Sequence, residues 1–87
     1  MAKIKVKDLN HLKNILSERD GETREFFILL NFGLRSRKLI SWDGDSTFYV
    51  LNEIDGTEQE LTEAQLMDRS YTNVGHALNR GALYLEN

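Results

Sequence analysis

The sequence predicts a single α+β domain over residues 1–87. We expect an N-terminal helix, an antiparallel sheet of three to four strands, two short C-terminal helices and an extended tail, with the helices covering one sheet face. Aliphatic residues at helical spacing open the chain. Aromatic and branched runs separated by glycine-containing turns then extend from residue 26 to residue 53, and a helix-capping pattern begins at Thr62.

The first helix is expected over residues 8–19. Leu9, Leu12 and Leu16 recur at helical spacing and form one apolar stripe. Asp8 is a suitable N-cap because its carboxylate can accept hydrogen bonds from the free N–H groups of the first turn. Gly21 is a suitable stop because glycine tolerates the left-handed backbone found beyond helix ends.

The strands are expected at residues 26–32, 38–42 and 47–53, with a short edge strand at 58–61. The run Phe-Phe-Ile-Leu-Leu-Asn-Phe is apolar on both faces, which favours a central strand. We expect a turn at residues 33–36. A second turn at Asp43-Gly44 suits a hairpin, since this pair tolerates positive φ angles.

The C-terminal part is expected to hold two short helices, at about residues 62–69 and 73–80. Thr62 and Gln65 fit a capping box, in which each side chain bonds the backbone N–H of the other. Gly81 would end the second helix. Residues 82–85 then form an extended tail that could add a last strand.

Composition narrows the function classes. The chain has no cysteine, which excludes thiolate metal sites and disulfides and favours a reducing, cytoplasmic setting. Its longest apolar run, residues 26–30, is too short to span a bilayer. The net charge of −3 is uneven, because residues 1–40 hold nine Lys or Arg against five Asp or Glu, whereas residues 41–87 hold two against nine. Two oppositely charged faces, or pairing between the halves, would both explain this split.

No catalytic pattern is present. His11 and His76 belong to no metal-binding motif, and no serine lies in a nucleophile elbow. Asp43 and Asp45 do not complete a calcium loop, because Thr47 stands at the third ligand position. We therefore expect no enzyme activity, no metal and no cofactor. A metal-dependent hydrolase that uses these acidic turns is the third-ranked alternative.

Two charged segments are the candidate binding sites. The basic segment could bind an anion or a partner, because arginine recognises phosphate or carboxylate with two parallel bonds and a glycine-led turn can present N–H groups. The acidic segment, which follows a strand, could meet a basic partner. A solvated loop that pairs with neighbouring charges is the alternative for each. The basic segment comprises Gly33, Arg35, Ser36, Arg37 and Lys38, and the acidic segment comprises Asn52, Glu53, Asp55, Glu58 and Glu60.

Three blocks of the chain carry a resemblance. They are Phe27-Ile-Leu-Leu-Asn-Phe-Gly-Leu-Arg-Ser-Arg-Lys38, Asn52-Glu-Ile-Asp-Gly-Thr-Glu-Gln-Glu-Leu-Thr62 and Asn73-Val-Gly-His-Ala-Leu-Asn-Arg-Gly-Ala-Leu83. Together they resemble a group of small proteins of bacteriophages, prophages and other mobile elements that have no established activity. The element order is also similar to that of some small phage anti-CRISPR proteins. The resemblance implies a setting in a bacterial host cell and brings no catalytic residues.

These observations predict a small binding protein. The first expectation is a phage-type inhibitor that blocks a host anti-phage defence protein by direct contact. The alternative is an oligomeric sponge for a small anionic ligand such as a nucleotide signal. At least two subunits, for example a homodimer, would be needed to build its pocket, because one chain is too small. Nucleic-acid binding is disfavoured because the many carboxylates would repel a phosphate backbone.

Overall fold

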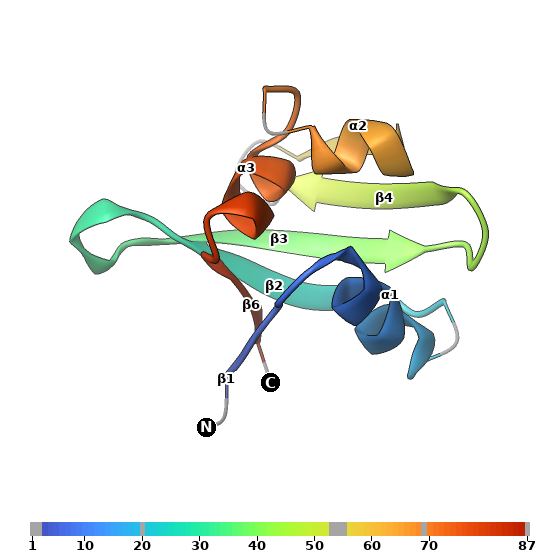
Figure 1. Cartoon of the computed structure of the whole chain (residues 1–87), viewed down its shortest axis with the longest axis horizontal. Helices are drawn as coiled ribbons and strands as arrows, with labels where there is room; N and C mark the ends of the chain where they lie inside the picture. Colours follow the sequence, from blue (N-terminus) through green and yellow to red (C-terminus); the bar gives the residue numbers. More distant parts are fainter. Residues whose placement is uncertain (1–2, 20, 53–55, 69, 87) are drawn as a thin grey trace.

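The computed structural model describes residues 3–19, 21–52, 56–68 and 70–86. These residues form an α+β fold with a six-stranded antiparallel sheet and three α-helices (Figure 1). The strand order is β1-β6-β2-β3-β4-β5. In chain order the elements are β1 (Lys3–Lys5), α1 (Leu9–Ser17), β2 (Arg24–Leu29), a 3₁₀ turn η1 (Asn31–Gly33), β3 (Arg35–Trp42), β4 (Thr47–Asn52), β5 (Thr57–Thr62), α2 (Glu63–Met67), α3 (Asn73–Asn79) and β6 (Leu83–Glu86).

The sheet is wider than the three to four strands predicted from the sequence. The expected tail is strand β6, which lies inside the sheet between β1 and β2. Leu83 and Leu85 of β6 are buried in the core, and this burial fixes the strand there. Strand β1, which was not predicted, pairs with β6 through Lys3 and Glu86. Its Lys-Ile-Lys sequence gives little apolar alternation, so it depends on β6 to become a strand.

The prediction of a turn at residues 33–36 is wrong. Strand β3 already begins at Arg35, because Arg35 pairs with Leu29 and Lys38 pairs with Phe26. Strand β2 ends at Leu29 instead of residue 32, and the chain reverses through η1. The central position of β2 and the edge position of β5 agree with the sequence-based expectation.

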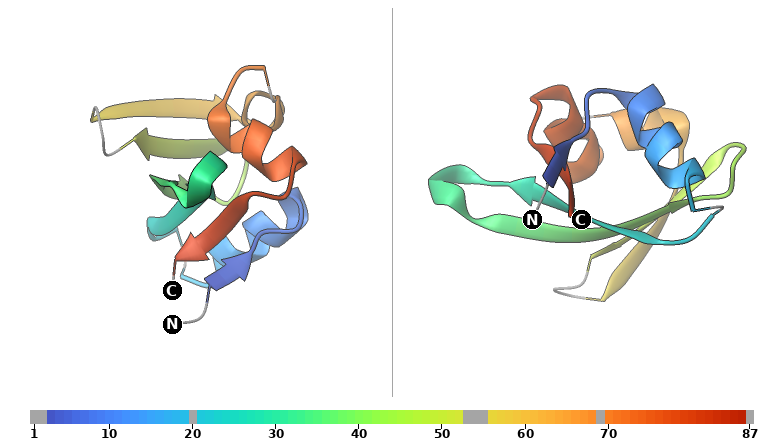
Figure 2. Two further views of the ribbon diagram at one scale, coloured as in Figure 1. Left: turned by 90° about the vertical axis from the view of Figure 1, so that its left-hand side faces the viewer. Right: turned by 90° about the horizontal axis from the view of Figure 1, so that it is seen from below.

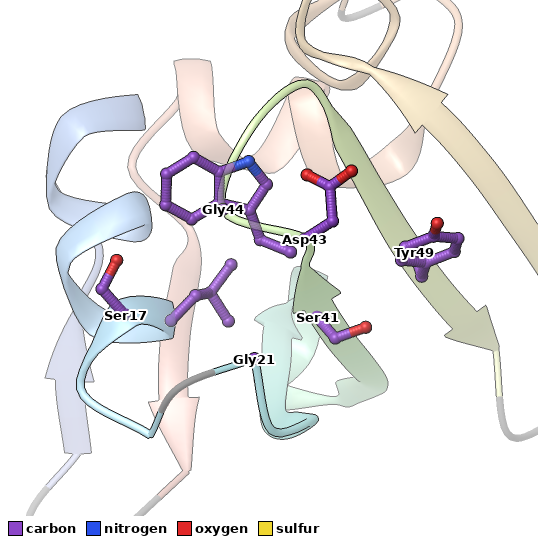
Figure 3. A pocket seen from close by; sticks show the side chains of 8 residues that line it. Ser17, Gly21, Ser41, Asp43, Gly44 and Tyr49 are labelled. Carbon is purple, nitrogen blue, oxygen red and sulfur yellow. The ribbon is translucent and has the colours of Figure 1, made fainter.

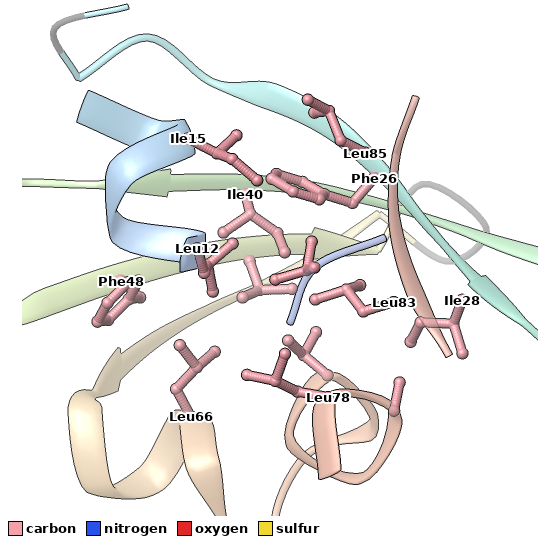
Figure 4. Close-up of a cluster of buried hydrophobic side chains, with 14 of the residues drawn as sticks. Leu12, Ile15, Phe26, Ile28, Ile40, Phe48, Leu66, Leu78, Leu83 and Leu85 are labelled. Atoms are coloured by element: carbon pink, nitrogen blue, oxygen red, sulfur yellow. The ribbon is translucent and has the colours of Figure 1, made fainter. Parts of the chain in front are cut away.

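The three helices pack on one face of the sheet (Figure 2). Helix α1 supplies Leu12, Ile15 and Leu16 to the core, and Asp8 caps it by accepting the N–H of His11 at 2.8 Å. From the sheet, alternate residues point toward the helices and complete one cluster, part of which is drawn in Figure 4. The sheet residues in this cluster are Phe26, Ile28, Ile40, Phe48, Val50, Leu61, Leu83 and Leu85.

The C-terminal helices are held by local caps. The predicted capping box of α2 is confirmed, because Thr62 and Gln65 exchange hydrogen bonds at 3.0 and 3.2 Å. At the start of α3, the Thr72 hydroxyl accepts the N–H of Gly75 and donates to the Leu66 carbonyl. This second cap ties α3 to α2 across their connection. None of the described helices is long and apolar enough to cross a membrane.

The opposite sheet face carries none of the described helices (Figure 2). Its centre is nevertheless closed by its own side chains. Phe27 is only 3% exposed, because Tyr84 stacks on it with ring centroids 5.2 Å apart and Arg35 lies over its ring at 4.4 Å. Lys3 in turn lies 5.5 Å from the Tyr84 ring centroid. Cation–π and ring contacts thus cover the middle of this face.

Candidate functional site

The basic segment does not form one site. Because its members from Arg35 to Lys38 belong to strand β3, their side chains alternate between the two sheet faces. Arg35 and Arg37 lie on the open face, whereas Lys38 pairs in register with core-facing Phe26 and is only 5% exposed. Ser36 shares the helix-covered face with Lys38, and Gly33 lies in the preceding turn.

The two arginines of this segment already have acidic neighbours. The Arg37 Nε lies 2.7 Å from a carboxylate oxygen of Glu25, and an Arg35 nitrogen lies 3.7 Å from a carboxylate oxygen of Glu86. Both pairs are partly exposed, so each contributes little to stability. They nevertheless neutralise the charge that an anion would need. An anion pocket built from the whole segment is therefore not formed within one chain.

The acidic segment is also divided. Asn52 lies opposite Lys38 and Thr57 in register and faces the helix side. Glu58 and Glu60 are exposed on the open face of edge strand β5. Glu53 and Asp55, the remaining acidic members, lie outside the described residues.

The Asp43 side chain accepts backbone hydrogen bonds within the β3–β4 turn. One carboxylate oxygen accepts the N–H of Asp45 at 2.8 Å and that of Thr47 at 3.2 Å. Both hydrogen bonds favour the charged carboxylate, and the bond from Asp45 has the larger effect. Together they lower the pKa of Asp43 below its ordinary value. The Asp43-x-Asp45 pattern is thereby explained as turn chemistry. Across the described part of the chain, no three His, Asp or Glu residues are grouped as metal ligands would be.

A hollow of about 300 Å³ lies beside this turn (Figure 3). That volume is at the lower limit for small-molecule pockets. Trp42 stacks on Phe48 in its wall, and Lys13 lies 5.5 Å from the indole ring. The Trp42 Nε1 is buried without a hydrogen-bond partner among the described residues. The hollow is lined by Leu16, Ser17, Gly21, Ser41, Trp42, Asp43, Gly44 and Tyr49, whereas Phe48 and Lys13 contact Trp42 from outside this lining.

The most unusual feature is the hairpin tip, residues 30–34, which joins β2 to β3. Figure 1 shows it projecting beyond the helices, and a hydrogen bond of 2.7 Å from the Leu30 N–H to the Leu34 carbonyl closes it. Phe32 is 100% exposed, Leu34 63% and Leu30 42%. Three large apolar side chains are thus presented to solvent within five residues.

The backbone at the tip adds a second observation. Phe32 has a φ of +65°, and among the described residues it is the only non-glycine with a positive φ. A left-handed backbone costs an ordinary residue about 1–2 kcal/mol. Since the exposed ring makes no compensating core contact, folding alone does not explain phenylalanine at this position. Residues in this conformation cluster at active sites, ligand clamps and switch regions.

The hairpin tip faces the end of α3 across a groove of about 510 Å³, called the tip groove below. Arg80 fixes this arrangement, because its Nη2 donates to the Leu29 carbonyl at 3.0 Å. The groove is lined by Leu30, Asn31, Phe32, Leu34, His76 and Arg80.

Sequence reasoning missed this site because it placed residues 26–32 in one buried strand. On that interpretation Phe32 belonged to the core. The available signal was Asn31-Phe32-Gly33, in which two turn-forming residues flank the aromatic. An apolar residue between them is better placed in a turn than in a central strand.

Comparison with protein-family models, with curated proteins and with solved structures found no match to this chain.

Proposed function

We propose that this chain is a non-catalytic binding protein that docks on another protein through the hairpin tip. The observation that carries the proposal is Phe32, fully exposed on a left-handed backbone at the end of a projecting hairpin. Exposed apolar clusters of this kind mark interaction surfaces. Aromatic residues at the centre of such surfaces often dominate the binding free energy.

The expected contribution of Phe32 is substantial. Burying a fully exposed phenylalanine in an apolar pocket contributes about 1.5–3 kcal/mol. This equals roughly a ten- to hundredfold gain in affinity. Leu34 and Leu30 flank the ring and are also exposed, so the partner pocket would accommodate an apolar ridge. The closing bond between Leu30 and Leu34 holds the ridge in shape before binding, which reduces the entropy lost on association.

The resemblance to small phage proteins supports a bacterial host protein as the partner, with inhibition of anti-phage defence as the outcome. A binder that blocks a larger protein needs a contact surface that projects from its fold, and the hairpin tip projects beyond the helices (Figure 1). The anionic-ligand alternative has less support, because the basic segment is divided between two sheet faces and its arginines have carboxylate neighbours.

The proposal is tested by photo-crosslinking in bacterial cells. A photo-reactive phenylalanine analogue is placed at Phe32 and, as a matched control, at Tyr71, an exposed aromatic on the α2–α3 connection. We expect a discrete protein adduct from position 32 and none from position 71. Pull-down with Phe32→Asn should lose the same protein, whereas Tyr71→Asn should retain it. Undiminished capture by Phe32→Asn would remove the basis of the proposal.

A further inference from the structure

We infer that the tip groove binds an acidic, apolar segment of the partner protein, in which a large apolar side chain is flanked by aspartate or glutamate. This inference rests on the proposed function and names the partner's chemistry. It is carried by the two walls of the groove, which differ in character and come from separate parts of the chain.

One wall is apolar and the other is basic. Leu30, Phe32 and Leu34 of the hairpin tip form the apolar wall. His76, in the last turn of α3, and Arg80, just after it, form the second wall, called the basic wall below. A ligand that fills the groove must therefore satisfy both an apolar surface and donors of hydrogen bonds.

The basic wall is oriented by a hydrogen bond and is accessible to a ligand. The bond from Arg80 to the Leu29 carbonyl uses one guanidinium N–H and fixes the side chain beside the tip. Arginine carries five such N–H groups in a planar fork that matches a carboxylate. His76 is exposed, and its side chain has no hydrogen bond within residues 3–19, 21–52, 56–68 and 70–86. No carboxylate from these residues lines the groove, so the positive charge of Arg80 is available to a ligand.

A protein segment fits these walls better than an anionic membrane. The site is a concave groove with two basic side chains, whereas lasting attachment to a membrane needs a larger basic patch or a second anchor. A carboxylate beside an apolar side chain, in contrast, can contact both walls at once.

The inference is tested with the full chain and short synthetic peptides by fluorescence anisotropy. Each peptide carries one central Phe, Leu or Trp, flanked by Asp and Glu, by Asn and Gln, or by Lys. We expect acidic flanks to bind about tenfold more tightly than amide flanks, as for one charge-assisted hydrogen bond. Lysine flanks should bind most weakly, and added salt should reduce the acidic preference.

Variants separate this inference from the proposed function. His76→Gln and Arg80→Gln should each lower the ratio of the affinity for acidic-flanked peptides to the affinity for amide-flanked peptides. Arg19→Gln, an exposed arginine beyond the end of α1, is the matched control and should bind as the wild type does. Phe32→Asn should weaken all peptides. Because Arg80 also contacts the hairpin, His76→Gln keeps the test valid if Arg80→Gln destabilises the fold.

Each outcome has a defined meaning. If acidic-flanked and amide-flanked peptides bind equally tightly and Phe32→Asn weakens both, the inference is overturned and the proposed function stands. If the peptides bind Phe32→Asn as tightly as they bind the wild type, the proposed function is overturned. Failure of all peptides to bind overturns the inference. If vesicles of phosphatidylcholine and phosphatidylserine then bind through Phe32, a membrane is the ligand in place of a protein.

Discussion

Replacing Phe32 with asparagine should make the protein more stable although it removes a large apolar side chain. The ring is 100% exposed, so its removal forfeits no buried area. The φ of +65° costs phenylalanine about 1–2 kcal/mol, and asparagine tolerates this region better because its short side chain bonds the local backbone. We expect the free energy of unfolding to rise by roughly 0.5–1 kcal/mol. For a domain of this length that is a gain of about 2–8 °C in Tm.

The measurement is urea unfolding and thermal melting followed by circular dichroism. The control is Phe27→Asn on the neighbouring strand, whose ring is 3% exposed and stacked on Tyr84. That variant should lose about 3 kcal/mol or more. Phe32→Gly should change little, since relief of the left-handed backbone is offset by the entropy of glycine in the unfolded chain. A loss above about 1 kcal/mol in Phe32→Asn would refute the reasoning, because the ring would then contribute to folding.

Two further substitutions test the fold. Gly75→Ala should destabilise the protein by about 1–3 kcal/mol in urea unfolding, because the new methyl group would overlap the Leu66 carbonyl oxygen where α3 approaches α2; an unchanged midpoint would contradict this close approach. Asp43→Asn should remove an acid-sensitive contribution to stability. The lowered folded-state pKa means that the Asp43 carboxylate stabilises the fold above its ordinary titration range and loses this effect as pH falls through the lowered value. The wild-type and variant midpoints should therefore converge on acidification, and a constant difference across the acid range would count against the turn bonds to Asp45 and Thr47.

Local chemistry made much of the fold predictable. Asp8 caps α1 and Thr62 caps α2 as expected, because a side-chain oxygen at the right offset satisfies free backbone N–H groups whatever the rest of the chain does. Asp43 and Gly44 form the β3–β4 turn for a similar reason. The apolar stripe of α1 also identified its buried face correctly. In each case the deciding contacts lie within a few residues along the chain.

Contacts between distant segments decided the rest. Residues Lys3 to Lys5 form strand β1 because they pair with β6, although their sequence does not favour a strand. The register between β2 and β3 sends Arg37 and Lys38 to opposite faces, and it separates the basic segment that looked continuous in the sequence. The same pairing ends β2 at Leu29 and leaves Phe32 in the turn beyond it. Apolar character alone does not distinguish a buried phenylalanine from an exposed one, because burial depends on which strands and helices from other parts of the chain pack against it.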